Sequence, residues 1–232
     1  RRHVLRARFT GDFQGTNHTR DYHEVSAGWR EVFPHGRSLS LGFYSLPGYY
    51  LRQLTAEDYT APVGVTRYKR SQFDLSIGSA AWDQAINQRT DLELAYQLEH
   101  RGYVPDFKER TSDTHQGKVS LQFSGKRPAT DVTLIGGYRV SKAKAKDGDE
   151  VGGVADDEDV SYKGPILGLD GRYEFSREKN TRWSGDASYL LGYRKYDSDR
   201  AFDVYHNGRH DLIHTFEAGM RFAMRPHWAV RG

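Results

Sequence analysis

Apolar and polar residues alternate with a period of two along most of the chain. In the first segment Leu5, Ala7 and Phe9 lie on one side, while Arg6 and Arg8 lie on the other. A period of two is typical of a β-strand whose two faces meet different surroundings. The pattern predicts about ten strands, at residues 5–13, 24–30, 39–43, 72–77, 92–99, 118–123, 132–140, 167–175, 186–194 and 215–222.

Short and long links alternate between these predicted strands. The short links are Pro34–Arg37, Asn87–Thr90, Lys126–Thr130, Ser176–Arg182 and Arg225–His227. The long ones are Gly15–Asp21, Thr55–Thr66, Lys108–Asp113, Asp147–Asp159 and Ser198–Asp211. An up-and-down meander places links of one kind at one end of a barrel, and outer-membrane barrels have short periplasmic turns and longer outer loops. Because the first link is long, we expect the first strand to run outward from the periplasm.

The composition favours strands over membrane helices. Hydrophobic residues make up 37% of the chain, and no stretch approaches the roughly 18 consecutive apolar residues of a membrane helix. Aromatic residues reach 13% while Met numbers only 2, a balance that suits a pleated surface better than a helix. With Cys at 0, neither a disulfide framework nor a thiolate metal site can form.

Charge gives no indication of nucleic-acid binding. The 34 basic and 31 acidic residues are interspersed, whereas a nucleic-acid binder more often gathers a basic stripe. Arg1, Arg2 and His3 lead into the first alternating segment without the apolar region of a signal peptide. For an exported protein, we expect this numbering to begin after processing or inside a longer chain.

Alternation alone does not separate a membrane barrel from a soluble β-sandwich, because both have one apolar face per strand. Size and strand length favour the membrane barrel. About eight strands already give an interior that side chains just fill, so ten or more would leave an apolar cavity unless the apolar face pointed outward into lipid. Many runs extend for about ten residues, as a bilayer-crossing strand requires. Aromatic residues also fall near the ends of the apolar runs, as interfacial girdles do: Phe13, Trp29, Phe123, Tyr193 and Phe222.

In this pattern of strands and links the chain resembles bacterial outer-membrane β-barrels as a class, over essentially its whole length. The resemblance implies an all-β, antiparallel, up-and-down transmembrane barrel in the bacterial outer membrane, with residues 1–232 as one domain. The chain stops at residues 229–232, where an eleventh strand would begin. Because single-chain bacterial barrels have an even number of strands, we expect a truncated barrel with about twelve strands in its smallest closed form.

The two faces give two sets of candidate residues. The predicted lumen-lining residues are Arg6, Arg8, Glu24, Arg30, Asp74, Glu93, Glu99, Lys118, Arg139, Asp170, Arg172, Asp186, Arg194, Glu217 and Arg221. The predicted lipid-facing residues are Leu5, Phe9, Trp29, Phe43, Leu75, Leu94, Tyr96, Leu121, Leu134, Leu169, Tyr189, Phe216 and Phe222. The charges either line an aqueous channel and tune its selectivity, or pair across strands and fill the lumen.

Three further segments carry candidate chemistry. The Asp147–Asp159 loop is rich in carboxylates that suit a divalent cation or a bridge to lipopolysaccharide, although a solvated charge run is the commoner explanation. His206, His210 and Asp211 lie close together in the sequence, but their spacing matches no established catalytic motif, and Asn207-Gly208 is typical of a turn. Pro47-Gly48-Tyr49-Tyr50 interrupts the third strand and predicts a bulge or the emergence of the strand from the membrane, with the tyrosines in a sugar-binding vestibule or at the interface.

These observations favour a hydrophilic pore for passage or export of a polar solute or polymer. A non-conducting barrel that serves assembly, anchoring or adhesion is the alternative, and an outer-membrane hydrolase built on His206, His210 and Asp211 is the second alternative. We expect no enzymatic activity, no cofactor, no dedicated metal centre and no nucleic-acid partner. The expected partners are outer-membrane lipid, lipopolysaccharide and periplasmic or outer-membrane proteins.

Overall fold

A computed structural model describes residues 2–12, 22–56, 67–104, 110–125, 130–144, 160–177, 181–198, 207–224 and 228–231. In these ranges the chain folds into one antiparallel sheet in which every strand pairs with its neighbours in sequence. The strands are β1 (Arg2–Asp12), β2 (Tyr22–Phe33), β3 (Arg37–Ala56), β4 (Arg67–Asn87), β5 (Thr90–Tyr103), β6 (Ser112–Ser124), β7 (Thr130–Ala143), β8 (Tyr162–Arg177), β9 (Thr181–Tyr196), β10 (His210–Met224) and β11 (Trp228–Arg231). The described residues include no helix long and apolar enough to cross a membrane.

The structure confirms the predicted all-β meander and the predicted alternation of links. Short links at residues 34–36, 88–89, 125–129, 178–180 and 225–227 alternate with long links at residues 13–21, 57–66, 104–111, 144–161 and 197–209. The strands extend further than predicted, so Arg37, Thr55, Asp113 and Asp211 belong to strands and not to links. A four-residue β11 begins where an eleventh strand was predicted.

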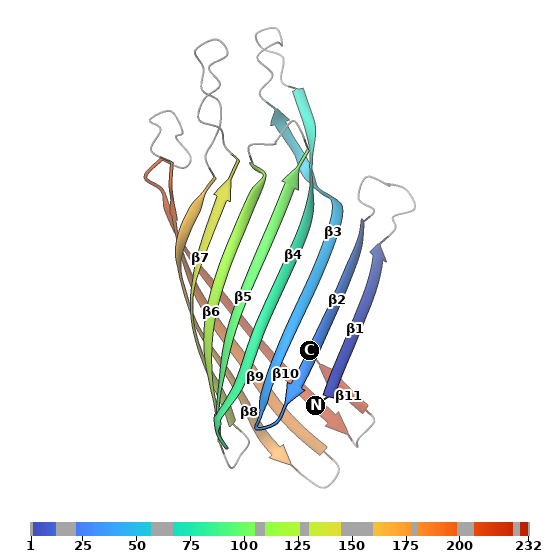
Figure 1. Cartoon of the computed structure of the whole chain (residues 1–232), viewed down its shortest axis with the longest axis vertical. Coiled ribbons are helices and arrows are strands. Elements are labelled where there is room, and N and C mark those ends of the chain that lie inside the picture. The colour runs from blue at the N-terminus through green and yellow to red at the C-terminus, as the bar shows by residue number, and fades with distance from the viewer. Residues whose placement is uncertain are drawn as a thin grey trace.

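The sheet curls strongly about its long axis. In Figure 1, β8, β9 and β10 pass behind the strands at the front, with the opposite slant, so the sheet has a concave and a convex face. No pairing joins β1 to β10 or β11 within the described ranges, and the sheet is therefore open along its first and last strands.

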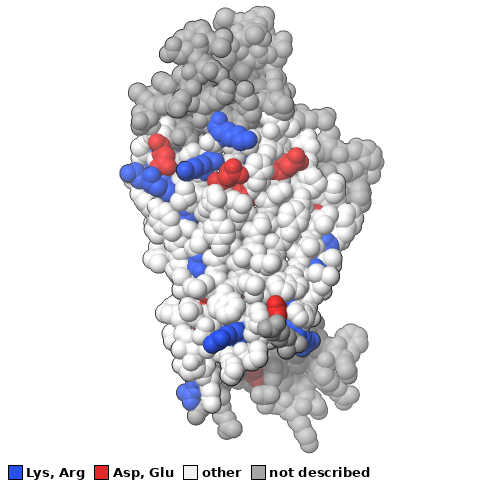
Figure 2. Space-filling model, viewed as in Figure 1, with Lys and Arg blue, Asp and Glu red and all other residues white. Residues whose placement is uncertain are grey.

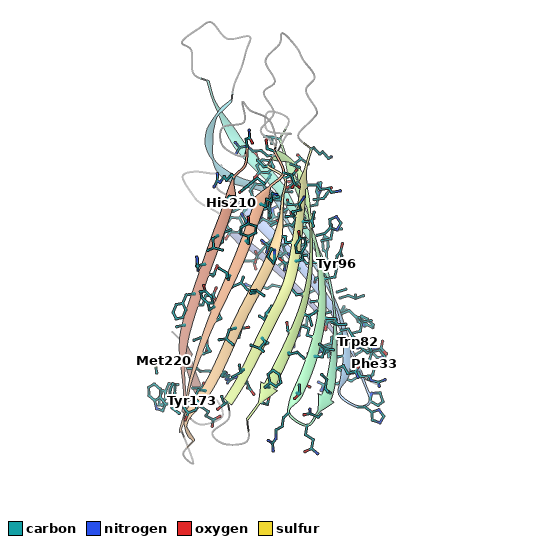
Figure 3. The ribbon with its side chains drawn as sticks, turned by 90° about the vertical axis from the view of Figure 1, so that its left-hand side faces the viewer. Phe33, Trp82, Tyr96, Tyr173, His210 and Met220 are labelled. Carbon is teal, nitrogen blue, oxygen red and sulfur yellow. The ribbon has the colours of Figure 1, made fainter. Side chains whose placement is uncertain are left out.

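Burial is inverted relative to that of a water-soluble protein. The convex face exposes large apolar side chains on every long strand, with Leu5 79% and Phe216 71% exposed. Figure 3 shows Tyr96, Trp82 and Tyr173 pointing away from the hollow of the sheet. The most buried residues are mainly small and polar, among them Ser38, Thr114, Gln116, Ser141 and Ser184.

β3 contains a β-bulge at Pro47-Gly48. A bulge was one of the two alternatives predicted from the sequence. The register passes from Leu46 opposite Leu75 to Tyr49 opposite Phe73, so two residues of β3 face one residue of β4. Gly48 has φ 64, a backbone conformation that favours glycine. Its N–H donates to Asp74 Oδ1 at 2.6 Å, and its carbonyl accepts from Gln72 Nε2 at 2.9 Å. These bonds satisfy the backbone N–H and C=O of Gly48 at the bulge.

Candidate functional site on the concave face

The strand register places nearly all of the predicted lumen-lining residues on the concave face. Antiparallel partners point to the same side of a sheet, so the pairs can be followed from strand to strand. Arg30 pairs with Ser40, Glu93 with Asp83, and Arg172 with Asp186. The residues found on this face are Arg6, Arg8, Glu24, Arg30, Glu93, Glu99, Lys118, Arg139, Asp170, Arg172, Asp186, Arg194, Glu217 and Arg221.

Asp74 and Leu75 are the exceptions, and the register exchanges the faces predicted for them. Leu75 pairs with Leu46 and Arg101 and therefore lies on the concave face, whereas Asp74 lies on the convex face beside Gly48. The prediction assumed that the apolar side of every strand is convex, which does not hold in this part of β4. The other residues predicted to face lipid all lie on the convex face: Leu5, Phe9, Trp29, Phe43, Leu94, Tyr96, Leu121, Leu134, Leu169, Tyr189, Phe216 and Phe222.

Near the short links, Arg30 and Asp83 on the concave face are joined across three strands. Arg30 on β2 donates from Nη2 to Ser38 Oγ at 2.9 Å, and the Ser38 hydroxyl donates to Asp83 Oδ2 at 2.5 Å. Arg30 also forms an ion pair with Asp83 at 3.3 Å. Three adjacent strands thus share one polar network, which neutralises two of the charges on this face.

Similar bonds occur further along the concave face. The Tyr44 hydroxyl donates to Glu24 Oε2 at 2.9 Å, and Arg139 Nε donates to Gln116 Oε1 at 2.7 Å. Both bonds link neighbouring strands. Some of the charged residues predicted to line the lumen are therefore bonded to side chains of neighbouring strands. Pairing across strands was one of the two roles predicted for these charges.

An aromatic cluster, formed by Tyr22, Tyr49, Phe73 and Tyr103, crosses four strands near the long links. The ring centroids are 5.8 Å apart for Tyr22 and Tyr49, 5.6 Å for Tyr49 and Phe73, and 5.3 Å for Phe73 and Tyr103. The Arg101 guanidinium lies 5.9 Å from the Phe73 ring centroid. Phe73 is 9% exposed, so the cluster forms a small apolar core on the concave face. Tyr49 belongs to a segment for which the sequence predicted a vestibule or interfacial role, whereas Tyr22 and Tyr103 were not predicted as candidates.

A cavity of about 190 Å³ lies on the concave face beside the aromatic cluster. Its polar wall includes the Glu99–Arg101 ion pair, at 2.7 Å, and the Thr114 hydroxyl, which donates to Ser141 Oγ at 2.9 Å. The lining residues are Glu99, Arg101, Tyr103, Arg110, Ser112, Thr114, Ser141, Val160, Tyr162 and Tyr196. Carboxylate, guanidinium and hydroxyl groups beside tyrosine rings can hydrogen-bond and stack on a polar solute.

The β8–β10 side of this cavity is held by an arginine-rich network. The Arg194 guanidinium lies 4.6 Å from the Tyr162 ring centroid. Arg209 donates to both oxygens of Asp211, at 2.8 and 3.0 Å, and the Tyr196 hydroxyl donates to the same carboxylate at 3.2 Å. Hydrogen bonding to Asp211 raises the pKa of the Arg209 guanidinium, which therefore stays charged. The network fixes the Tyr196 ring at the edge of the cavity.

The structure separates two of the three residues on which the hydrolase alternative is built. His210 pairs with Lys195 on the convex face, whereas Asp211 pairs with Arg194 on the concave face, so the two side chains point to opposite sides of the sheet. Adjacent strand residues always diverge in this way. His206 lies outside the described residues. Gly208, with φ 66, confirms the turn predicted for Asn207-Gly208.

The predicted cation site in the Asp147–Asp159 loop also lies outside the described residues. Within the described part of the chain, no group of three or more His, Cys, Asp or Glu side chains is arranged to hold a metal ion. Comparison with known proteins found no family model, no curated protein and no solved structure that matches this chain. We therefore infer function from the two faces of the sheet and from the cavity.

Proposed function

We propose that this chain forms most of a closed outer-membrane β-barrel whose concave face lines an aqueous passage for a polar solute or polymer. The observation that carries the proposal is the apolar convex face. Leaving a Leu or Phe side chain in water instead of hydrocarbon costs about 1.5–3 kcal/mol, and large apolar side chains are exposed on every long strand. Lipid around the convex face removes this cost.

The height of the apolar face supports the membrane assignment. On β9 the convex aromatic residues Trp183 and Tyr193 bound the apolar segment. They are ten positions apart, or about 33 Å along the strand at about 3.3 Å per residue. At the usual barrel tilt of about 40°, that length gives about 25 Å along the membrane normal, the height of the apolar band in outer-membrane barrels. In Figure 2 the charged side chains gather toward the two ends of the visible face, and its broad middle is largely uncharged.

A sheet whose convex face lies in lipid also needs to close into a barrel. An open strand edge leaves unpaired backbone N–H and C=O groups, each of which costs several kcal/mol in hydrocarbon. The free edges of β1 and β11 therefore need partners in the membrane. A twelfth strand between these edges is the smallest addition that gives the even number found in bacterial barrels.

The concave face suits a polar passenger. Its charges have both signs, and its cavity near the long links combines the Glu99–Arg101 pair with Tyr103, Tyr162 and Tyr196. With β1 running outward from the periplasm, the long links and the cavity lie at the external mouth. A solute that enters there meets hydrogen-bonding groups before it reaches the middle of the barrel.

Planar-bilayer recording of the full chain tests the pore. We expect steady conductance, with an ion selectivity that shifts toward anions when the concave carboxylate is removed in Asp170→Asn. Asp197→Asn is the matched control, because Asp197 pairs with Lys163 on the convex face and its loss removes the same charge outside the passage. A folded, inserted protein that never conducts would overturn the pore proposal.

The second candidate is a non-conducting barrel that acts as an assembly, anchoring or adhesion module. The cross-strand network of Arg30, Ser38 and Asp83 favours this candidate, because bonded side chains can fill the lumen near the short links. The same recordings separate the two candidates. A silent wild-type barrel that opens in Ser38→Ala, where the network is weakened, would support the closed module.

A further inference from the structure

A basic row lies on the convex face at the long-link end of β7 to β10. We define the basic row as Lys142, Lys163, Lys195 and His210, all of which are exposed. Lys163 pairs directly with Lys195, and Lys195 pairs with His210. Lys142 lies two positions beyond Val140, the partner of Lys163 on β7. Four adjacent strands thus contribute one basic side chain each to the same band.

This arrangement leaves a local surplus of positive charge. Like charges directly opposite each other on neighbouring strands are destabilising. Asp197 binds Lys163 at 2.8 Å, but among the described residues neither Lys142 nor Lys195 has an ion-pair partner. Asp113 lies opposite Lys142 in the register and contacts His100 at 2.6 Å, so the three lysines face two carboxylates and keep an excess of positive charge. An anion beside the row would offset this repulsion.

The row borders the apolar band directly. One step of two residues below it, about 7 Å along each strand, the convex face carries Val140, Pro165, Tyr193 and Leu212. Leu212 is 58% exposed, and Leu167, one step below Pro165, is 57% exposed. A ligand that fits both bands has negative charge at one end and hydrocarbon at the other. A membrane lipid with a phosphate headgroup has this chemistry.

The row is confined to one side of the sheet. At the corresponding level of β2 to β4, the convex face carries His23, Ser45, Ser76 and Asp74, with no Lys or Arg among them. A general attraction to anionic membranes would need no such asymmetry. We propose that the basic row binds the phosphate groups of an anionic lipid of the outer leaflet, whose acyl chains lie against the apolar band of β7 to β10. The proposal rests on the membrane placement proposed above, but it does not depend on conduction.

Thermal unfolding of the full chain in phosphatidylcholine vesicles, with and without diphosphoryl lipid A, tests the proposal. We expect lipid A to raise the unfolding temperature of the wild type. The triple variant Lys142→Gln, Lys163→Gln, Lys195→Gln should bind lipid A roughly a hundredfold more weakly. The estimate follows from about fivefold in affinity per lysine near an anionic surface. Inorganic phosphate should give no shift, because it lacks the acyl chains.

Three controls keep the outcomes distinct. Arg37→Gln removes a positive charge from the convex face at the short-link end of β3, whereas the basic row lies at the long-link end of the sheet. This variant should retain the response to lipid A. Replacement of the same three lysines by Arg should retain it as well, and Lys195→Gln alone serves if the triple Gln variant does not fold. Unchanged conductance in the Gln variant separates lipid binding from the pore.

A wild type with no response to lipid A would overturn the lipid site even if it conducts. Equal responses of the wild type and the Gln variant would also overturn it. If the Gln variant loses stability equally in both kinds of vesicle, the lysines serve a contact within the protein, and the lipid assignment is again wrong.

Discussion

Two regions of one sheet have opposite polarity. Across most of β5 to β10, large apolar side chains lie on the convex face and polar ones on the concave face. In the part of β3 and β4 near the bulge, Leu46, Phe73 and Leu75 lie on the concave face, while Gln72 and Asp74 lie on the convex face. Figure 1 shows β3 and β4 continuing beyond the other strands at the long-link end.

The comparison shows that alternation of apolar and polar residues indicates that the two faces of a strand meet different surroundings. It does not indicate whether the apolar face meets lipid or packs against the protein itself. Under the proposed membrane placement, lipid covers the convex face of the main sheet. The extension of β3 and β4 lies beyond the lipid, where its convex side meets water and its apolar side packs into the aromatic cluster. The level of Leu46 and Leu75 then marks the outer boundary of the membrane. Substitutions inside and outside the lipid-covered part of the sheet should therefore differ in cost.

Phe73→Ala should cost the most, about 3–5 kcal/mol of unfolding free energy, because it removes a buried ring and leaves a cavity among Tyr49 and Tyr103. Phe216→Ala should cost only the transfer contribution, about 1.5–3 kcal/mol, because lipid fills the space that the ring leaves. Urea unfolding of both variants in vesicles measures the difference, and hydrogen exchange should show faster opening of β3 and β4 in Phe73→Ala alone. Equal costs would mean that the two rings meet the same surroundings.

An introduced arginine locates the lipid more directly. Leu169 lies midway along β8 on the convex face, so Leu169→Arg should cost about 2–4 kcal/mol in vesicles, as a cation near the bilayer midplane does. Ser76→Arg, on the convex face of β4 near the polarity change, should cost about 0–1 kcal/mol. Refolding into vesicles with urea titration gives both values. A large cost at Ser76 would place the membrane boundary beyond the bulge.

Alanine at the bulge glycine should have the smallest of these effects. Gly48 has φ 64, and a Cβ there would lie 2.9 Å from Gln72 Nε2, so Gly48→Ala should cost about 1–2 kcal/mol. Gly78, on the convex face of β4, has nothing within 4 Å of an added Cβ, and Gly78→Ala should be neutral or slightly stabilising. The same urea titration compares the two, and a neutral Gly48→Ala would show that the left-handed backbone is not required there.

The period of two was sufficient to predict the order of the strands, the alternation of links and the face of most charged residues, because those features are local. Strand ends were less predictable: Thr55, Asp113 and Asp211 are polar, yet all three lie in strands. The cavity was missed because its lining comes from five strands and from link residues such as Arg110 and Val160, which only the register brings together.

The exchanged faces of Asp74 and Leu75 have a different cause. Nothing in the local sequence distinguishes an apolar residue that packs against its own chain from one that meets lipid. The aromatic cluster includes Phe73, which precedes Leu75 by two positions on the same face, and depends on Tyr22 and Tyr103, which are far from both in the sequence. Only the three-dimensional structure places these rings on the same side.

The bulge at Pro47-Gly48 also bears on how insertions and deletions can accumulate in this chain. Loss of one residue from the middle of a regular strand turns every later side chain over, because alternate positions point to opposite sides. Pro47 and Gly48 together face a single residue of β4, so loss of Gly48 would remove this bulge and leave Tyr49 opposite Phe73. The length of β3 can therefore change by one residue here without reversing the orientation of the segment that follows.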